Sequence, residues 1–334
     1  MIKVSFQNGI ISLENNSIPR LDDFDHSNVL VKVNYSGLCG SDVHRLKEFF
    51  SIKNNIPTLG HEIVGTVFKS SAKKFKVGDI AVVQPIGYCA ECENCLLGKI
   101  QFCNNSINIG KNIDGGFSEY IKVPERLLYK IDLLEKEYTL TDSLACIIHS
   151  ENSIGKIKNK HICIIGDGSV SEIAVRYFSL NNKVTNLVKN SESRNDIYCD
   201  RINIEEARKE PKFRDMFDIV LECVGGDNEY LIDYSVNLLK YGGILIVLGV
   251  YKKDFYPKIY LRNLLFKEIK LAGSNSFVIS QEIDEFSSAV KFIKKNIKRL
   301  DGIITHEIPL KDFKLGLDIF NDKKITKAQK IVFI

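Results

Sequence analysis

The stretch ICIIGDGSVSE, residues 162–172, constrains the fold more than any other part of the chain. A short, unbroken apolar run such as ICIIG (162–166) is typical of a strand that is buried on both faces of a parallel sheet. Three more apolar runs follow: KVTNLV (183–188), FDIVLECVGG (217–226) and ILIVLGVY (244–251), the last after the helix-like NEYLIDYSVNLLKYGG (228–243). Strands that alternate with helices at this spacing predict an α/β, doubly wound parallel sheet.

The turn after the first of these strands has the spacing of a dinucleotide-binding loop, with Ser171 in the place of the third glycine. Gly166 and Gly168 meet the two requirements nearest the phosphates, a tight turn and a close approach of the backbone. Ser171 adds only a hydroxymethyl group where the helix packs on the strand. Asp167 and Glu172 lie at the helix N-terminus, where they would weaken pyrophosphate binding if they pointed inward. The sequence leaves the direction of these two side chains open.

The end of the second strand bears on the choice of cofactor. The acid that binds the ribose 2′-hydroxyl in NAD-dependent loops would fall near Lys189, and a lysine cannot accept that hydrogen bond. Lys189 and Arg194 could instead bind a 2′-phosphate, or Lys189 could be an ordinary solvated residue of a loop. We therefore expect NADP or NAD as cofactor, with NADP favoured.

Four of the nine cysteines lie close together, in the pattern C-x2-C-x2-C-x7-C. Cys89, Cys92, Cys95 and Cys103 offer four soft ligands and leave no open coordination position, which favours a structural zinc site. A set of four cysteines also suits an iron–sulfur cluster, and this alternative stays open. A chain of 334 residues needs no disulfide scaffold, so metal binding is favoured over disulfides.

A second set of metal-binding residue types is spread over the first part of the chain. GLCGSDVH (37–44) contains Cys39, and TLGHEIVG (58–65) contains His61 and Glu62. Cysteine, histidine and a carboxylate can bind zinc and leave one position free for water or substrate. Taken alone, a cysteine and a histidine this far apart are more often buried structural residues.

Five motifs occur in order along the first part of the chain: GLCGSDVHR (37–45), IPTLGHEIVGTV (56–67), VGDIAVV (77–83), the cysteine pattern and DGGFSEYIKVP (114–124). This series resembles the zinc-containing medium-chain dehydrogenase/reductase (alcohol dehydrogenase) family. It is nearest to the polyol branch, with sorbitol, galactitol-phosphate and threonine dehydrogenases. The resemblance implies a GroES-like, β-rich catalytic domain over 1–146, completed by 275–334, and a Rossmann nucleotide-binding domain over 147–274.

The resemblance also implies a role for each residue of the second set. Cys39 and His61 match the catalytic zinc ligands, and Glu62 matches a carboxylate that ligates the zinc or exchanges with water. Asp142, in TDSLACIIHS (141–150), matches the remaining ligand, although it could also be a helix N-cap. Three further residues match supporting roles of the family. Asp42 would orient the ring of His61, and Ser41 would bind the alcohol. His44 would be the outer member of a proton relay.

The resemblance implies a zinc-dependent oxidoreductase that transfers a hydride between NAD(P) and a secondary alcohol or ketone, such as a polyol, a sugar alcohol or its phosphate. It implies two zinc ions per chain, a small-molecule substrate, and a homodimer or homotetramer. The alternative is a non-catalytic, zinc-stabilised scaffold or regulatory subunit with a decayed cofactor site. The net charge of +4 and the lack of a basic, aromatic block argue against nucleic acid. We see no signal peptide and no apolar run of ~20 residues, so we expect a cytoplasmic protein that spans no membrane.

Overall fold

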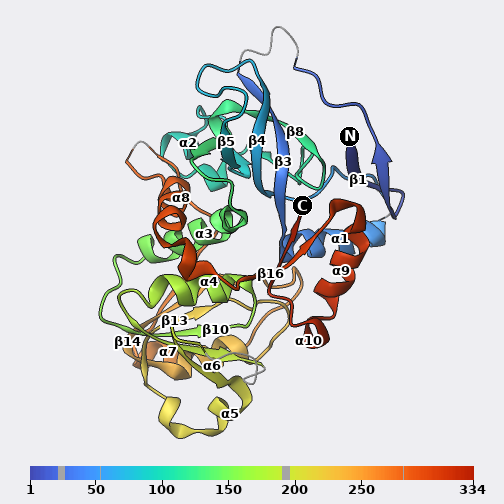
Figure 1. The fold of residues 1–334 in the computed structure, drawn as a ribbon. Coiled ribbons are helices and arrows are strands. Elements are labelled where there is room, and N and C mark those ends of the chain that lie inside the picture. Colours follow the sequence, from blue (N-terminus) through green and yellow to red (C-terminus); the bar gives the residue numbers. More distant parts are fainter. Residues whose placement is uncertain (22–26, 53, 190–195, 281) are drawn as a thin grey trace. The chain divides into compact units, whose positions relative to one another are not determined.

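The computed structural model describes residues 1–334 apart from 22–26, 53, 190–195 and 281. The chain divides into two compact units (Figure 1). The first consists of residues 1–145 and 277–334, so it contains both ends of the chain, and the second consists of residues 146–276. Among the described residues, none of the helices is both long and apolar enough to cross a membrane.

A largely antiparallel sheet forms the centre of the first unit. Its strands are β3 (Asn28–Leu38), β4 (Glu62–Ser70), β5 (Ile80–Val83), β8 (Tyr120–Pro124), β9 (Leu128–Ile131), β16 (Ile304–Ile308) and β17 (Lys330–Phe333). Over the described residues the strand order is β16-β17-β3-β4-β5-β9, and β8 also pairs with β3. Within this sheet, β16 and β17 run parallel and the other neighbours run antiparallel. The expected β-rich character of this part of the chain is confirmed.

Shorter elements complete the first unit. β1 (Ile2–Gln7) and β2 (Ile10–Asn15) form a hairpin, and β6 (Ile86–Gly87) pairs with β7 (Ile107–Asn108). The helices are α1 (Gly40–Ile52), α2 (Glu93–Leu96), α8 (Glu285–Asn296), α9 (Phe313–Asn321) and α10 (Lys323–Thr326), while α3 (Thr141–Asn152) begins in this unit and ends in the second.

The register of three neighbouring strands brings distant parts of the sequence together at one end of the sheet. β3 ends at Leu38 and β4 begins at Glu62, and the two strands pair with Gly37 opposite Glu62. On its other side β3 pairs with β17, where Ile331 lies opposite Leu38. The residues just beyond these strand ends therefore lie close to one another.

A parallel sheet forms the centre of the second unit. Its strands are β10 (His161–Ile165), β11 (Lys183–Val188), β12 (Asp200–Asn203), β13 (Phe217–Glu222), β14 (Leu239–Val247) and β15 (Lys270–Gly273). Over the described residues the order is β12-β11-β10-β13-β14-β15, and each neighbouring pair is parallel. The chain winds outward from β10 first to one side and then to the other, so the predicted doubly wound sheet is confirmed.

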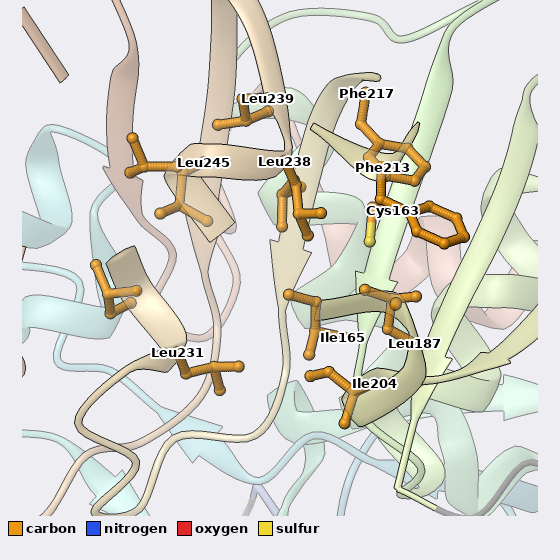
Figure 2. Close-up of a cluster of buried hydrophobic side chains, with 14 of the residues drawn as sticks. Cys163, Ile165, Leu187, Ile204, Phe213, Phe217, Leu231, Leu238, Leu239 and Leu245 are labelled. Atoms are coloured by element: carbon orange, nitrogen blue, oxygen red, sulfur yellow. The ribbon is translucent and has the colours of Figure 1, made fainter. Parts of the chain in front are cut away.

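Helices cover both faces of this sheet. They are α4 (Ser169–Phe178), α5 (Ile204–Lys209), α6 (Leu231–Leu238) and α7 (Leu261–Phe266), and Figure 1 shows α4 on one side of the strands and α6 on the other. Figure 2 shows the apolar cluster in which α5 and α6 meet the strands, with Cys163, Ile165 and Leu187 among its members. Ile164, which points to the opposite face, is also fully buried. Burial on both faces explains the unbroken apolar run at this strand.

One boundary in the second unit differs from the prediction. The helical pattern over 228–243 predicted a helix up to the glycine pair, but α6 ends at Leu238 and β14 begins at Leu239. Gly242 has a φ of +73°, which a right-handed helix does not permit. Periodicity cannot locate this boundary, because consecutive leucines suit a buried helix and a buried strand equally well.

Candidate active site

Four cysteine side chains of the first unit surround one point. The Sγ–Sγ distances are 3.4 Å for Cys92–Cys95, 3.5 Å for Cys89–Cys103, 3.8 Å for Cys89–Cys95 and 3.9 Å for Cys92–Cys103. Four sulfur atoms bound tetrahedrally to zinc at about 2.3 Å would lie about 3.8 Å apart, so the group fits a single zinc ion. An iron–sulfur cluster divides its four thiolates between two or more irons, which places sulfur atoms on different irons further apart. The spacing therefore favours zinc.

Backbone amides support the thiolate form in this group. The N–H of Cys92 donates to Sγ of Cys89 at 3.4 Å, and the N–H of Cys89 donates to Sγ of Cys103 at 3.4 Å. Hydrogen bonds from the backbone of Glu91 and Cys92 lower the pKa of Cys89 to about 6. Burial raises the pKa of Cys95 to about 12. A divalent cation at the centre would favour the thiolate at every position, because only the thiolate binds metal.

A second group of possible metal ligands lies at the strand ends of the same unit. The donor atoms of Cys39, His61 and Glu62 lie within 4.8 Å of one another. Cys39 follows the last residue of β3, and His61 precedes the first residue of β4, so the pairing of these strands brings the two together. Cysteine, histidine and glutamate are a donor set that suits zinc.

Asp42 orients two members of this group. Asp42 lies in the first turn of α1 and is buried. It accepts a hydrogen bond from the N–H of Cys39 at 3.0 Å, and its other oxygen lies 3.2 Å from Nδ1 of His61. Burial alone would lower the pKa of His61, but Asp42 and Cys39 raise it well above its usual value. With Nδ1 occupied by Asp42, Nε2 is the nitrogen that can bind a metal.

Lys330 of β17 also contacts Glu62. The ammonium group and the carboxylate form an ion pair, and both side chains are almost fully buried. Burial alone would lower the pKa of Lys330, but the nearby Glu62 raises it. Ser143 Oγ also lies 3.4 Å from Oε1 of Glu62. Lys330 therefore offsets one of the negative charges that the ligand group concentrates in the interior.

Asp142 lies beside this group but outside its closest set. Its Oδ2 is 3.8 Å from Nε2 of His61, and burial raises the pKa of Asp142 to about 6. Thr141 already has helical backbone angles, so Asp142 lies inside α3 and is not its N-cap. The capping alternative is therefore wrong, and Asp142 lies beside the candidate metal ligands.

Ser41 and His44 lie on α1, next to the ligand group in sequence. Both are exposed to solvent. They are three residues apart on a helix and so share one of its faces. Two polar side chains in this arrangement can pass a proton from the ligand group toward water.

The glycine loop of the second unit has the geometry that the sequence predicted for it. Gly166 has a φ of +137°, which favours glycine. A Cβ on Gly168 would meet nothing within 4 Å, so the backbone there is open to a ligand. Ser171 is buried, and its hydroxyl donates to the carbonyl of Gly168 at 2.7 Å inside the first turn of α4. The serine at the third position is therefore accommodated by a local hydrogen bond.

The two acids at this loop differ in their surroundings. Asp167 is exposed. Glu172 is fully buried and accepts a hydrogen bond from Nη1 of Arg201 at 2.6 Å. The charge of Glu172 is thus compensated within the protein. Lys189 is exposed directly after β11, at the carboxyl end of that strand, while Arg194 lies outside the described residues.

Sequence reasoning missed two features of these sites. Lys330 is the first residue of β17, whose sequence shows only an apolar pattern. Arg201 of β12 belongs to no recognisable motif. Their partners are Glu62 and Glu172, from other parts of the chain. The one available signal was a charged residue within or beside an apolar strand, which is too common to be informative.

Comparison with known proteins supports the resemblance drawn from the motifs. Residues 25–133 match the family model of the alcohol dehydrogenase GroES-like domain. The chain is also similar to D-arabinitol dehydrogenase 1 of Uromyces fabae, with 27% identity over 321 residues that cover 91% of this chain and 89% of that protein. The resemblance to the zinc-containing medium-chain alcohol dehydrogenase family is confirmed. The motifs GLCGSDVHR and TLGHEIVG, which carry the resemblance, lie within the matched residues.

Solved structures share the fold of this chain. Galactitol-1-phosphate dehydrogenase from Escherichia coli has a TM-score of 0.86 and 21% identity, and the match covers all of both chains. A protein from Sinorhizobium meliloti 1021, bound to NADP, has a TM-score of 0.86 and 24% identity, covering 100% of this chain and 98% of that one. The expected α/β fold with a GroES-like domain is confirmed.

Proposed function

We propose that the protein transfers a hydride between NAD(P) and a secondary alcohol or ketone, with a polyol, a sugar alcohol or its phosphate as substrate. The convergence of Cys39, His61 and Glu62 on one point carries the proposal. The names of two similar proteins, D-arabinitol dehydrogenase 1 and galactitol-1-phosphate dehydrogenase, support this class of substrate.

We assign two zinc ions to each chain. Cys89, Cys92, Cys95 and Cys103 would hold the first, as a closed structural site. Cys39, His61 and Glu62, with Asp142 beside them, would hold the second. When bound there, zinc supplies the Lewis acidity that lowers the pKa of an alcohol hydroxyl.

The side chains around the second site would orient the zinc ligands and transfer the alcohol proton. Asp42 keeps His61 in the tautomer that presents Nε2, and its bond to the N–H of Cys39 fixes the loop that carries the thiolate. Ser41 would accept the alcohol proton at Oγ and pass its own toward His44. The imidazole of His44 is exposed and can release a proton to water.

The glycine loop would bind the cofactor in the second unit. The open backbone at Gly168 and the N-terminus of α4 suit a pyrophosphate. Lys189 at the end of β11 favours a 2′-phosphate, hence NADP over NAD. The bound NADP in the similar protein from Sinorhizobium meliloti 1021 agrees with this preference. When bound, the nicotinamide cofactor would supply or accept the hydride.

Metal analysis combined with a substrate screen tests the proposal. We expect two equivalents of zinc per chain, and one equivalent after Cys39→Ala or after Cys92→Ala. Sugar alcohols, their phosphates and cyclitols would be screened with NADP and NAD, and Cys39→Ala should abolish turnover. Lys294→Met, which removes an exposed cation outside both groups, is the control and should change neither the zinc content nor the rate. A single equivalent of zinc that survives Cys39→Ala would refute the catalytic site.

The competing function is a non-catalytic, zinc-stabilised scaffold with a decayed cofactor site. Titration with NADH and NADPH, followed by nicotinamide fluorescence, separates the two functions. Binding of neither dinucleotide at millimolar concentration would favour the scaffold. The compensated charge of Glu172 and the open backbone at Gly168 support the enzyme.

We further propose a homodimer or homotetramer in the cytoplasm. β15 is an edge strand of the parallel sheet over the described residues, and it leaves backbone groups unpaired. Leu271 on this strand and Leu261, Leu265 and Phe266 on α7 are more than half exposed. Large exposed apolar side chains beside an open sheet edge suit a second copy of the chain. Cys89, Cys92, Cys95 and Cys103 form no disulfide although their sulfur atoms converge, as is usual in a reducing compartment. Light scattering on the wild type and on Leu271→Lys would test the assembly.

A further inference from the structure

A buried network of four charged side chains joins three segments of the second unit. Arg201 of β12 donates from Nη1 to Glu172 at 2.6 Å and from Nη2 to Asp196 at 2.5 Å. Arg176 of α4 donates from Nη1 to the other oxygen of Asp196 at 2.9 Å. The side chains of Arg201, Asp196 and Glu172 are 5%, 2% and 0% exposed.

Burial of this network costs desolvation free energy, and its hydrogen bonds require a specific geometry. Two cations and two carboxylates leave no net charge, but each group loses its hydration on folding. Apolar side chains could hold a helix against a strand at lower cost. Paired guanidinium and carboxylate groups fix direction as well as distance, because each hydrogen bond has a preferred angle. The gain from the network is therefore a defined arrangement of the backbone segments that it connects.

The three segments border the proposed cofactor loop. Glu172 lies in the first turn of α4, which begins directly after Gly168. Arg201 lies on β12, opposite Asn186 of β11, the strand that ends one residue before Lys189. In a parallel sheet the dinucleotide binds along the carboxyl ends of the strands, where the glycine loop and the end of the second strand meet its pyrophosphate and its adenosine ribose.

Asp196 extends the network to the chain between β11 and β12. Its carboxylate also accepts a hydrogen bond from the N–H of Tyr198 at 2.9 Å. The guanidinium of Arg176 lies 4.1 Å from the centre of the Tyr198 ring, so α4 holds this segment by a second contact. Residues 196–198 are thus bound to both α4 and β12.

We propose that Arg201 is a positioning residue for the adenosine half of the dinucleotide. By binding Glu172 and Asp196 at once, it holds the helix of the pyrophosphate loop and residues 196–198 in one arrangement before the cofactor arrives. The inference rests on the proposed function and deepens its cofactor site. Both arginines are already paired with carboxylates, so within the part of the chain that the structure describes the exposed Lys189 is the cation at this strand end that suits a 2′-phosphate.

Cofactor binding in matched variants tests this role. We compare the wild type with Arg201→Met, Arg201→Lys and Asp196→Asn. The control is Arg208→Met, which removes an exposed arginine of the same unit that pairs with Glu205. The measurements are the Kd of NADPH and NADH by fluorescence, the Kd of ADP-ribose and 2′,5′-ADP by competition, the zinc content, and kcat and KM for the cofactor.

We expect Arg201→Met to raise the Kd of the dinucleotides and of both adenosine fragments about tenfold, because the segment must then be ordered on binding. KM for the cofactor should rise in parallel, while kcat at saturating cofactor stays within about twofold, since the network touches no reacting atom. Arg201→Lys should recover part of the loss. If Arg201→Met does not fold, Asp196→Asn keeps the shape and should show the same division between KM and kcat.

Two results would overturn the role of Arg201. Variants that melt at a lower temperature yet bind the dinucleotides and the fragments as tightly as the wild type would show that the network is only structural. A loss of kcat equal to the rise in KM would also contradict it. A wild-type protein that binds neither NADH nor NADPH would instead refute the proposed function, and the positioning role with it.

Discussion

Lys330, in the last strand of the chain, forms a buried ion pair with Glu62, the first residue of β4. The pair leaves no room for a side chain on Gly37 of β3, where a Cβ would lie 2.2 Å from Oε2 of Glu62 and 3.1 Å from Cε of Lys330. The closing strand is thus joined to the candidate metal ligands by charge as well as by the sheet. The C-terminal segment is part of the site.

Replacement of Lys330 by methionine should destabilise the first unit strongly. The variant leaves the carboxylate of Glu62 buried without a cation, and breaking a buried pair in this way costs about 3–5 kcal/mol. We expect this loss in the free energy of unfolding, measured by urea denaturation. Lys330→Met combined with Glu62→Gln should recover part of it, because no uncompensated charge is then buried.

Lys294→Met is the matched control for this experiment. Lys294 pairs with Asp132 at the surface of the same unit, where both side chains are mostly exposed. Its replacement should leave the free energy of unfolding unchanged within error. If Lys330→Met were no more destabilising than this control, the buried pair would contribute nothing to stability.

The parts of the site that could be predicted from the sequence are those in which the partners are close along the chain. The cysteine pattern predicted a group that does converge on one point, and the spacing of Gly166 and Gly168 predicted the turn after β10. The strands were predictable because each apolar run is short, and three of the four runs contain or end at a glycine. These signals depend only on residues that are close together in the sequence.

The partner of a buried charge could not be predicted in the same way. Nothing near Glu172 in the sequence indicates that its side chain turns away from the cofactor loop, because Arg201 reaches it only through the pairing of β12 with β11. Lys330 reaches Glu62 only through the position of β17 beside β3. Such contacts depend on the register of strands from separate parts of the chain, which a single sequence does not reveal.

Replacement of Asp42 by asparagine should weaken metal binding without unfolding the protein. Asparagine has the same shape, but it lacks the charge that orients the ring of His61. Loss of such a partner typically lowers metal affinity or activity by about 10–100-fold. We expect a decrease of this size in kcat/KM and in the affinity for the second zinc ion, measured by competition with a chelator. Asp132→Asn, at the exposed surface of the same unit, is the control. Equal zinc affinity in Asp42→Asn and the wild type would refute the orienting role.

The contribution of Asp196 to stability should depend on pH in a defined direction. Burial alone would raise the pKa of Asp196, but the N–H of Tyr198 and the guanidinium groups of Arg201 and Arg176 lower it. A carboxyl whose pKa is lower in the folded state stabilises that state above its unfolded pKa, about 3.9. The contribution is lost as the pH falls through the folded pKa.

The wild type and Asp196→Asn should therefore converge at low pH. The difference in their free energies of unfolding should be constant from neutral pH down to about pH 4, the unfolded pKa of aspartate, and should shrink below it. Urea denaturation at a series of pH values measures this difference, and titrations common to both proteins cancel in it. A difference that stays constant or grows toward pH 3 would contradict the assigned cause.

Alanine at the two glycines of the cofactor loop should separate backbone strain from ligand contact. Gly166 has a φ of +137°, and a Cβ there would lie 3.3 Å from Oγ of Ser171, so Gly166→Ala should cost about 1–3 kcal/mol of stability even without cofactor.

Gly168 has a φ of −91°, and its Cβ would point into open space, so the free protein should tolerate Gly168→Ala. The added methyl group would instead lie where the pyrophosphate approaches the backbone and should weaken dinucleotide binding. Thermal melting of the free protein and fluorescence titration with NADPH measure the two effects. Tight binding of NADPH by Gly168→Ala would place the cofactor elsewhere.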